Sequence, residues 1–237
     1  MRDDGPQPSP PSGPSHELKF TFLNALAPTL VRWLQLRCPP DPDHPDGLVS
    51  SIYFDSPDGY CLAGKTNSDY LKTKVRWRWY ADPDTGEPGD PAFLEIKSKT
   101  GSNRSKLRIP TRRTGAWLSR VPLTDSRLLE AGDLLLRRGV LPPRAWYPAF
   151  QITYRRWRFL EPCTGGRLCV DAHITAPRVH PRLAPRAPDL ALAHGVLEFK
   201  TPQDDLPPFL HPLTALGCRR ESFSKYLACF RRLRGFG

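Results

Sequence analysis

Basic residues occupy every second position of the segment YLKTKVRWRWY, residues 70–80. The alternating cations are Lys72, Lys74, Arg76 and Arg78, and the apolar residues between them are Val75, Trp77 and Trp79. Successive side chains of a β-strand point to opposite faces, so this spacing predicts a strand with one cationic and one apolar face. A row of Lys and Arg suits phosphate binding, because arginine donates paired hydrogen bonds to phosphate oxygens.

Charged and apolar residues alternate in the same way in five further segments. Their in-phase charged residues are Glu95, Lys97 and Lys99; Arg104, Lys106 and Arg108; Arg156 and Arg158; Arg167 and Asp171; and Glu198 and Lys200. A single strand of this kind could place its charges in water, but six favour a closed sheet with a charged interior. Cations crowded inside would repel each other by several kcal/mol unless a polyanion lies among them, and a chain of phosphates is the expected ligand.

Composition limits the class of protein. The 237 residues carry a formal net charge of +11, which indicates a polyanionic partner or a basic surface. No apolar run approaches the roughly 18 residues of a membrane span, and the proline-rich start lacks the apolar centre of a secretory signal. The six cysteines lack zinc-site spacing and are interpreted as reduced thiols of a cytoplasmic protein. Residues 1–15 are expected to be a disordered lead, followed by one domain over residues 16–235.

Periodicity predicts the elements that must position these charges. Eight strands are expected, at residues 16–22, 48–56, 70–80, 93–99, 104–110, 149–160, 167–174 and 196–201. Helical spacing predicts helices within residues 24–37, 114–138 and 221–233, the first with Pro28 in its opening turn. The Pro/Arg-rich segment 176–194 is expected to be a loop.

The sequence resembles a known family in nine ordered segments. HELKF, SSIYFDS, KVRWRWY, FLEIKSKT, SKLRI, YRRWRF, RLCVD, VLEFKT and FSKY occur in the order seen in VTC domains, the polyphosphate polymerase domains of the triphosphate tunnel metalloenzyme superfamily. The resemblance runs from about His16 to about Arg232. It implies an α+β fold, with a closed antiparallel β-barrel tunnel of about eight strands and flanking helices.

The resemblance also implies roles for individual residues. Those expected to hold the phosphates of ATP and polyphosphate are Lys19, Arg76, Arg78, Lys97, Lys106, Arg156, Arg167 and Lys225. Glu198 would bind Mn²⁺ or Mg²⁺, and together with Arg76, Arg78 and Lys97 it would form the catalytic set. Arg156 is preferred to Arg155 because Arg156 keeps phase with Tyr154.

The implied reaction is transfer of the γ-phosphoryl group of ATP to phosphate or polyphosphate, with release of ADP. The attacking phosphate is already ionised at neutral pH, so positioning and charge neutralisation suffice without a general base. Related triphosphatases carry an ExExK signature on the first strand, whereas only Glu17 precedes Lys19 here. Fewer carboxylates activate water less and favour transfer over hydrolysis. Without SPX-type or membrane segments, the chain resembles a stand-alone bacterial module.

Several alternatives stay open at this stage. A tri- or polyphosphatase and a non-catalytic polyphosphate-binding module fit the same cations. Nucleic-acid binding is disfavoured, because Trp77 and Trp79 lie opposite the cations, whereas a base-stacking platform needs both on one face. Glu17 and Glu95 are expected to hold Lys19 and Lys97 rather than to bind metal, and His173, in phase with Asp171, is expected to be a lone strand histidine. Without the family resemblance, Lys225 would be taken for a surface lysine.

Overall fold

A computed structural model describes residues 16–56, 71–100, 103–142, 145–185, 189–201 and 206–235. The expected lead 1–15 and Cys61 lie outside the described residues. Lys72, Lys99 and Arg104 belong to described strands, but their side chains are outside the described part. The remaining charged residues singled out by the sequence can all be placed.

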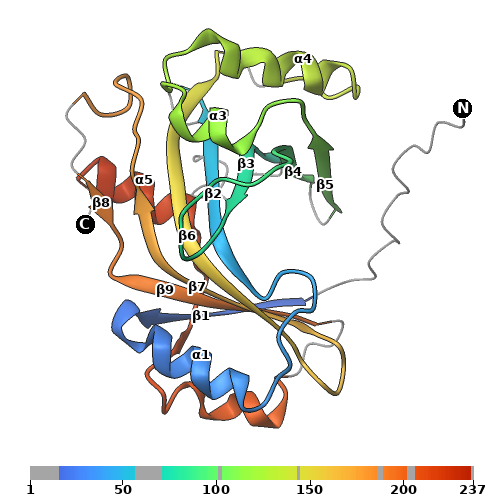
Figure 1. Cartoon of the computed structure of the whole chain (residues 1–237), viewed down its shortest axis with the longest axis vertical. Coiled ribbons are helices and arrows are strands. Elements are labelled where there is room, and N and C mark those ends of the chain that lie inside the picture. Colours follow the sequence, from blue (N-terminus) through green and yellow to red (C-terminus); the bar gives the residue numbers. More distant parts are fainter. Residues whose placement is uncertain are drawn as a thin grey trace, which may run out of the picture.

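The body of the protein is a ten-stranded antiparallel sheet in the order β10-β1-β9-β7-β6-β2-β3-β4-β5, with β8 paired to β7 (Figure 1). The strands are β1 (His16–Leu23), β2 (Asp46–Asp55), β3 (Leu71–Ala81), β4 (Phe93–Thr100), β5 (Asn103–Pro110), β6 (Tyr147–Leu160), β7 (Arg167–Ala176), β8 (Leu190–Ala191), β9 (His194–Thr201) and β10 (Arg219–Arg220). Eight of them are the predicted strands. The two-residue β8 and β10 were not predicted.

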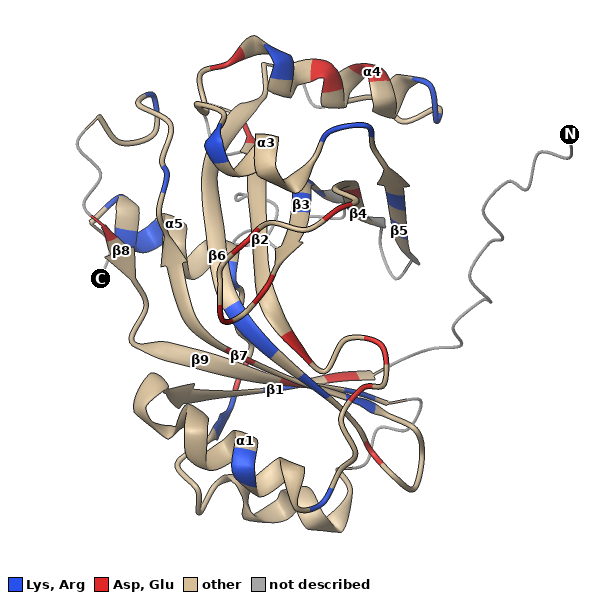
Figure 2. Ribbon diagram, in the orientation of Figure 1, with Lys and Arg blue, Asp and Glu red and all other residues tan. Residues whose placement is uncertain are grey.

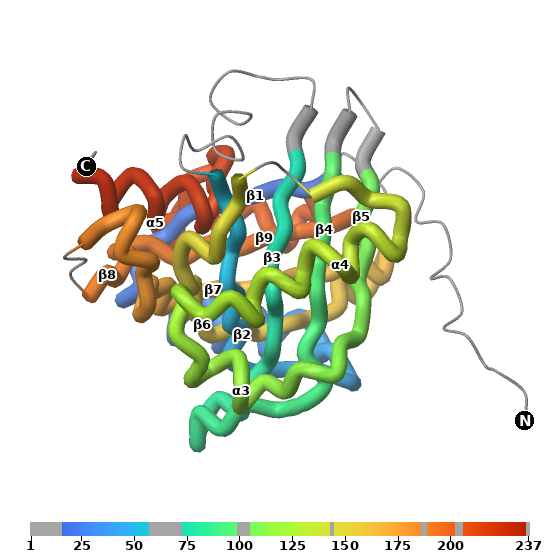
Figure 3. The backbone as a smooth tube through the Cα atoms, turned by 90° about the horizontal axis from the view of Figure 1, so that it is seen from above, coloured from blue at the N-terminus to red at the C-terminus, as the bar shows by residue number. Residues whose placement is uncertain are grey.

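The expected closed barrel is wrong, because the sheet curves without closing (Figures 1 and 3). At one end of the sheet, Phe20 and Thr21 of β1 pair with Arg220 and Arg219 of β10. That pairing occupies the middle of the edge of β1 to which a closing strand would have to bond. At the other end, β5 pairs with β4 and with no second strand among the described residues.

Short helices cover the outer face of the sheet (Figure 1). They are η1 (Asn24–Leu26), α1 (Ala27–Gln35), α3 (Gly115–Arg120), η2 (Ser126–Glu130), α4 (Ala131–Leu136) and η3 (Pro208–Leu213). The predicted helix within 114–138 is divided into three pieces, since α3 ends before Pro122 and a new N-cap, Asp125, begins η2. Among the described residues no helix combines the length and apolarity that crossing a bilayer demands.

Two apolar clusters join the outer face to these helices. One packs α1 and η3 on β1, β7 and β9, and its members include Leu30, Leu34 and Phe199. The other packs α3, η2 and α4 on β2, β3 and β4 around Trp77 and Trp79, which are almost completely buried. The predicted apolar face of the strand at residues 70–80 therefore forms core.

Helix α5 (Lys225–Leu233) lies on the opposite side of the sheet, which we call the inner face, the face bearing Arg76, Arg156 and Glu198. A third apolar cluster packs Tyr226, Cys229 and Phe230 of α5 against residues of β2, β6 and β7. Apolar packing with α5 thus occupies one end of the inner face. The rest of the inner face carries the charged residues.

Candidate functional site

The inner face gathers the predicted site residues from seven long strands and α5. They are Lys19 on β1, Arg76 and Arg78 on β3, Lys97 on β4, Lys106 on β5, Arg156 on β6, Arg167 on β7, Glu198 on β9 and Lys225 at the start of α5. Figure 2 shows the basic segments on β5 and β6. Side-chain contacts divide most of these residues into two clusters, each built around a buried carboxylate.

The first cluster centres on Asp171 of β7, whose side chain is completely buried. Arg156 donates from Nε and Nη2 to its two carboxylate oxygens, both at 2.6 Å. The Nζ of Lys225 lies 2.5 Å from Oδ2. Burial alone would raise the pKa of Asp171, but the charges of Arg156 and Lys225 outweigh burial and lower that pKa. Asp171 is therefore an ionised counter-ion whose oxygens are already engaged.

Glu198, beside Asp171 on the neighbouring strand, is held more loosely. Its carboxylate oxygens lie 3.2 Å from Nζ of Lys225, 3.7 Å from Nη2 of Arg156 and 3.8 Å from Nζ of Lys19. Burial would raise the pKa of Glu198, yet these cations, Lys225 foremost, lower it strongly. Glu198 is thus ionised; its Oε1 accepts a hydrogen bond from Lys225 at 3.2 Å, whereas its Oε2 lies 3.7 Å from Nη2 of Arg156.

These oxygen atoms fit a hard divalent cation. Mg²⁺ is commonly held by one or two carboxylates together with substrate phosphates, and it does not require a protein cage. The described residues contain no group of three or more His, Cys, Asp or Glu that could hold a metal ion. Glu198 therefore suits a cation shared with a phosphate ligand, and it does not suit a structural metal site.

The edge of the first cluster is formed by β1. Glu17 lies 3.7 Å from Nζ of Lys19 and 3.9 Å from Nζ of Lys200, so it accompanies Lys19 as expected. Lys19 also donates to the carbonyl oxygen of Phe223 at 3.3 Å. In the register of β1 and β9, Lys19 lies opposite Glu198 and Glu17 opposite Lys200. The two carboxylates are therefore diagonal neighbours around Lys19.

The second cluster centres on Glu95 of β4, which is 2% exposed. Arg76 donates to its Oε2 from Nε at 2.9 Å and from Nη2 at 2.6 Å. Arg78 and Arg108 approach its oxygens at 3.5 and 3.6 Å. Burial would raise the pKa of Glu95, but Arg78 and Arg76 lower it to about 2. The expectation that Glu95 holds Lys97 is wrong, because the arginines directly opposite it in the sheet engage its oxygens.

A row of lysines lies next to the Glu95 cluster. Lys97 is directly opposite Lys74 on β3 and Lys106 on β5. Although Lys97 is exposed to solvent, partial desolvation of its ammonium by the neighbouring strands, followed by the charges of Arg76 and Lys200, lowers its pKa to about 7. Since Lys200 belongs to β9, the curvature of the sheet brings β4 and β9 within electrostatic reach of each other. Like charges directly opposite each other destabilise a sheet, so this row favours a bound anion.

The alternation of strand residues decides which charged side chains reach the inner face. Arg156 is on the inner face, whereas Arg155 forms an ion pair of 2.5 Å with Asp46. Arg167 begins β7 opposite Lys200, with its side chain exposed. A β-bulge breaks the alternation on β7 at His173, which has φ 54° and is exposed, so His173 does not join Asp171 as a ligand.

Two tyrosines of the inner face belong to the site although they were not assigned to it from the sequence. Tyr53 accepts a hydrogen bond from Nη1 of Arg76 at 2.6 Å. Tyr154 accepts from Nη2 of Arg78 at 3.4 Å, and its ring lies 4.9 Å from Nζ of Lys225. Tyr154 therefore links the two clusters. Tyr154 lies two residues before Arg156 in ITYRR, so the alternation of the strand could have placed both side chains on the inner face.

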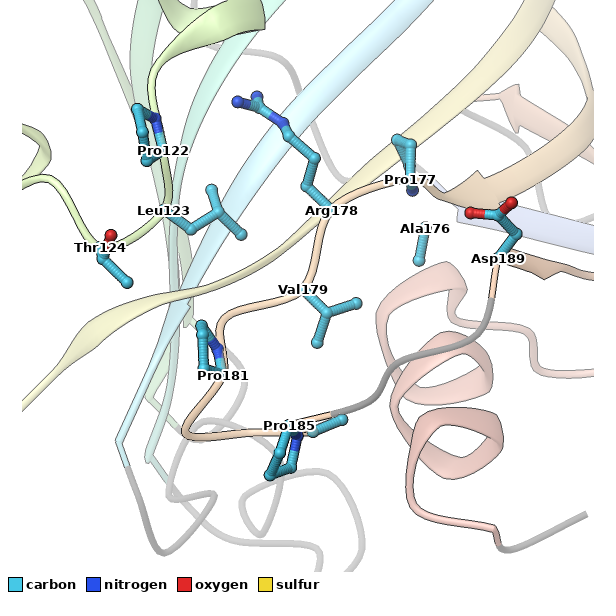
Figure 4. A pocket seen from close by; sticks show the side chains of 11 residues that line it. Pro122, Leu123, Thr124, Ala176, Pro177, Arg178, Val179, Pro181, Pro185 and Asp189 are labelled. Atoms are coloured by element: carbon cyan, nitrogen blue, oxygen red, sulfur yellow. The ribbon is translucent and has the colours of Figure 1, made fainter.

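A cavity of about 490 Å³ lies apart from these clusters, between residues 122–124 and the segment 176–189 (Figure 4). Its lining contains four prolines and none of the predicted site residues. Arg178 there donates to Oε1 of Gln151 and to the carbonyl oxygens of Leu118 and Val121. Those bonds fasten the segment to the end of α3, which is a structural role.

Comparison with known sequences identifies the family. A family model described as the VTC domain matches residues 15–234, nearly the whole chain. This chain belongs to the VTC domain family. Membership associates the chain with the phosphate-related enzymes of the tunnel-fold family. It agrees with the resemblance of the nine sequence segments. No curated protein is significantly similar to it in sequence.

Two solved structures are similar to this VTC domain in fold. A protein of Bacillus halodurans described as a candidate adenylate cyclase has 14% identity and a TM-score of 0.50, with 89% of this chain and 95% of that chain covered. The PH1819 protein of Pyrococcus horikoshii OT3 has 11% identity and a TM-score of 0.46, with 92% and 99% covered. At 14% identity, the similarity to the Bacillus halodurans protein shows a shared fold and says nothing about activity. Nothing is concluded from the lower TM-score of the PH1819 protein.

Proposed function

We propose that this VTC domain is an ATP-dependent polyphosphate polymerase. The observation that carries the proposal is the arrangement of the inner face, where cations of six strands and α5 share one surface and three of them, Lys225, Arg156 and Lys19, surround a loosely held carboxylate, Glu198. A bound triphosphate would satisfy the cations that have no short ion pair, foremost Lys97 and Lys106. Family membership adds independent support for a phosphate substrate.

In the proposed reaction, a terminal oxygen of phosphate or polyphosphate attacks the γ-phosphorus of ATP. A new P–O–P bond forms as the bond between the γ-phosphorus and the bridging oxygen breaks, and ADP leaves with the electron pair. The attacking oxygen is already ionised, so no protein base is required. Arg76, Arg78 and Arg156 would orient the phosphates and neutralise their charge.

Glu198, together with phosphate oxygens, would hold Mg²⁺ or Mn²⁺. Such an ion supplies neutralisation of the charge that develops on the transferred group. The low pKa of Glu198 keeps its carboxylate available to a cation throughout the neutral range. Asp171 and Glu95 are less suited to this role because arginine already engages them at 2.6 Å, and Glu17 is more exposed.

A nucleic-acid-binding function is less well supported. The two tryptophans of β3 are at most 1% exposed, so they cannot stack on bases. The reduced cytoplasmic setting and the bacterial origin remain expectations from the sequence.

The test incubates the purified protein with ATP and Mn²⁺ and resolves the products on a polyphosphate gel, with ADP and free phosphate quantified in parallel. Polymer and ADP in equal phosphoryl amounts are expected. Glu198→Ala should make neither, whereas Asp84→Ala, at a carboxylate 83% exposed on the surface, should behave like the native protein. Free phosphate without polymer would replace the proposal with a phosphatase. Tight binding of polyphosphate without any product would replace it with a binding module.

A further inference from the structure

The segment that leads into α5 crosses the inner face from β1 towards β2. On the β1 side, the backbone N–H of Glu221 donates to the carbonyl oxygen of Lys19 at 3.1 Å. Near the middle, Lys225 lies between Asp171 and Glu198. On the far side, the hydroxyl of Tyr226 donates to Oδ2 of Asp55 on β2. Lys225 is therefore held between attachments on two sides.

Lys225 occupies a position that its own helix does not favour. It is the first residue of α5, directly after the N-cap Ser224, whose hydroxyl accepts from the N–H of Leu227 at 3.4 Å. A cation in the first turn opposes the helix dipole, whose positive end lies there. The Lys225 side chain is also only 10% exposed, which adds a desolvation cost. Asp171 and Glu198 offset both costs only if the start of the helix is held against them.

Tyr226 is the residue that holds it. The side chain is 4% exposed, and its ring stacks on Phe150 with centroids 4.9 Å apart and lies 5.1 Å from the ring of Tyr53. Its hydroxyl reaches Asp55, which is 2% exposed and ends β2. An aromatic ring packed on both sides and bonded at its tip has little freedom to move. Because Lys225 directly precedes Tyr226 in the chain, the place of its backbone is fixed with that of Tyr226.

We infer that Tyr226, through its hydrogen bond to Asp55, is a positioning residue that sets Lys225 between Asp171 and Glu198. The consequence for phosphate binding rests on the proposed function, but the placement of Lys225 does not. Removing the hydroxyl of Tyr226 should release the start of α5 while leaving its apolar packing in place. The Lys225 ammonium should then lose its short contact with Asp171.

Phe230 offers a matched control on the same helix. It is 8% exposed and packs in the same apolar cluster, one turn beyond Tyr226. Its ring contacts the Tyr226 ring and the guanidinium of Arg234, but its side chain forms no hydrogen bond. Phe230→Leu should weaken the packing of α5 while keeping the hydrogen bond between Tyr226 and Asp55. A general loosening of α5 can therefore be told apart from a loss of position at Lys225.

The experiment is a pair of double-mutant cycles on the full chain, measured by urea unfolding without ligand. The first combines Tyr226→Phe with Lys225→Met, and the second combines Phe230→Leu with Lys225→Met. Tyr226→Phe should destabilise the native protein clearly more than it destabilises the Lys225→Met variant, because the ion pairs that the hydroxyl protects are absent there. Phe230→Leu should have equal effects in both backgrounds. Equal effects of Tyr226→Phe in both backgrounds would overturn the inference.

Calorimetric titration with tripolyphosphate then measures the consequence for ligand binding. Tyr226→Phe should weaken binding roughly fivefold in the native background and leave it nearly unchanged in the Lys225→Met background. Coupling in unfolding without any tripolyphosphate binding would overturn the proposed function and leave the positioning role standing. Should Tyr226→Phe not fold, Asp55→Asn gives the same cycle, and because it keeps an accepting oxygen it should show weaker coupling than Asp55→Ala.

Discussion

The two clusters of the inner face differ in how charge is balanced. In the first cluster, a completely buried carboxylate, Asp171, and a partly buried one, Glu198, are balanced by Arg156, Lys225 and Lys19. In the second cluster, the single carboxylate of Glu95 faces three arginines. Beside it, lysines of β3, β4 and β5 lie directly opposite one another. The first cluster can hold a cation together with phosphates, and the second can hold phosphates only.

The clusters also differ in origin. The Glu95 cluster comes from β3, β4 and β5, which follow one another along the chain as hairpins. The Asp171 cluster needs β1, β6, β7, β9 and α5, which are far apart in sequence. Local alternation is enough to build an anion-binding face, whereas the balanced cluster exists only once the whole chain has folded.

The largest expected effect is at Glu198. Glu198→Gln should lower the turnover of ATP about 100-fold or more, since the metal-dependent neutralisation of charge is lost. Binding of tripolyphosphate without metal should be retained or strengthened, because one negative charge is removed among cations. Steady-state ADP release and calorimetry check the two statements. If turnover survives, the assignment of a metal-holding role to the first cluster is wrong.

A smaller effect is expected at Arg76. Arg76→Met should weaken tripolyphosphate binding about tenfold, since charge-assisted hydrogen bonds are lost while Glu95 keeps Arg78 and Arg108. Arg155→Met is the matched control, because that arginine is paired with Asp46 away from the inner face. Equal weakening by the two variants would mean that net charge, and not the inner face, binds the ligand.

Removal of the counter-ion of the second cluster should have opposite effects on binding and stability. Glu95→Gln leaves three arginines without a carboxylate, so tripolyphosphate should bind about threefold more tightly at low salt. The free energy of unfolding should fall by about 3 kcal/mol, as expected when one partner of a buried ion pair is lost. Titrations and urea unfolding measure both quantities. Weaker binding by this variant would show that Glu95 orients the arginines for the ligand.

The smallest effect concerns the protonation of Lys97. With a pKa of about 7 in the free protein, Lys97 is largely neutral at pH 8.5, and a nearby polyanion favours its protonated form. Affinity for tripolyphosphate should therefore fall between pH 6 and pH 8.5 by a few-fold more than it does in Lys97→Met. That comparison cancels the titration of the ligand itself. Identical pH dependence in the two proteins would contradict the expectation.

The lowered pKa of Lys97 also predicts how the stability of the protein changes with pH. The pKa of Lys97 in the folded protein lies below its ordinary value of 10.5, so protonation of Lys97 opposes folding at low pH. That cost is complete below about pH 7 and is relieved as the pH rises towards 10.5. Relative to Lys97→Met, the native protein should thus become more stable across this window. Urea unfolding at several pH values measures the difference.

Much of the fold was predictable because alternation is a local property of the chain. Period two located the eight long strands and the faces of Arg76 and Trp77, and the order of the nine segments pointed to the VTC domain family. Local pattern failed where the backbone leaves its period. The bulge at His173 shows this for a strand, and the break at Pro122 shows it for a helix, where a proline and the new N-cap Asp125 interrupt the helical spacing.

The sequence by itself determined which residues alternate, and therefore which cations share the inner face. Only the tertiary structure decided their partners, because a carboxylate binds the cation that lies across the sheet and not the one nearest in sequence. Glu95 thus meets Arg76 and not Lys97, and Asp171 meets Lys225 from a helix more than fifty residues away. The same applies to closure of the sheet, since tertiary contact pairs β10 with part of the edge of β1 and does not bring β5 to that edge.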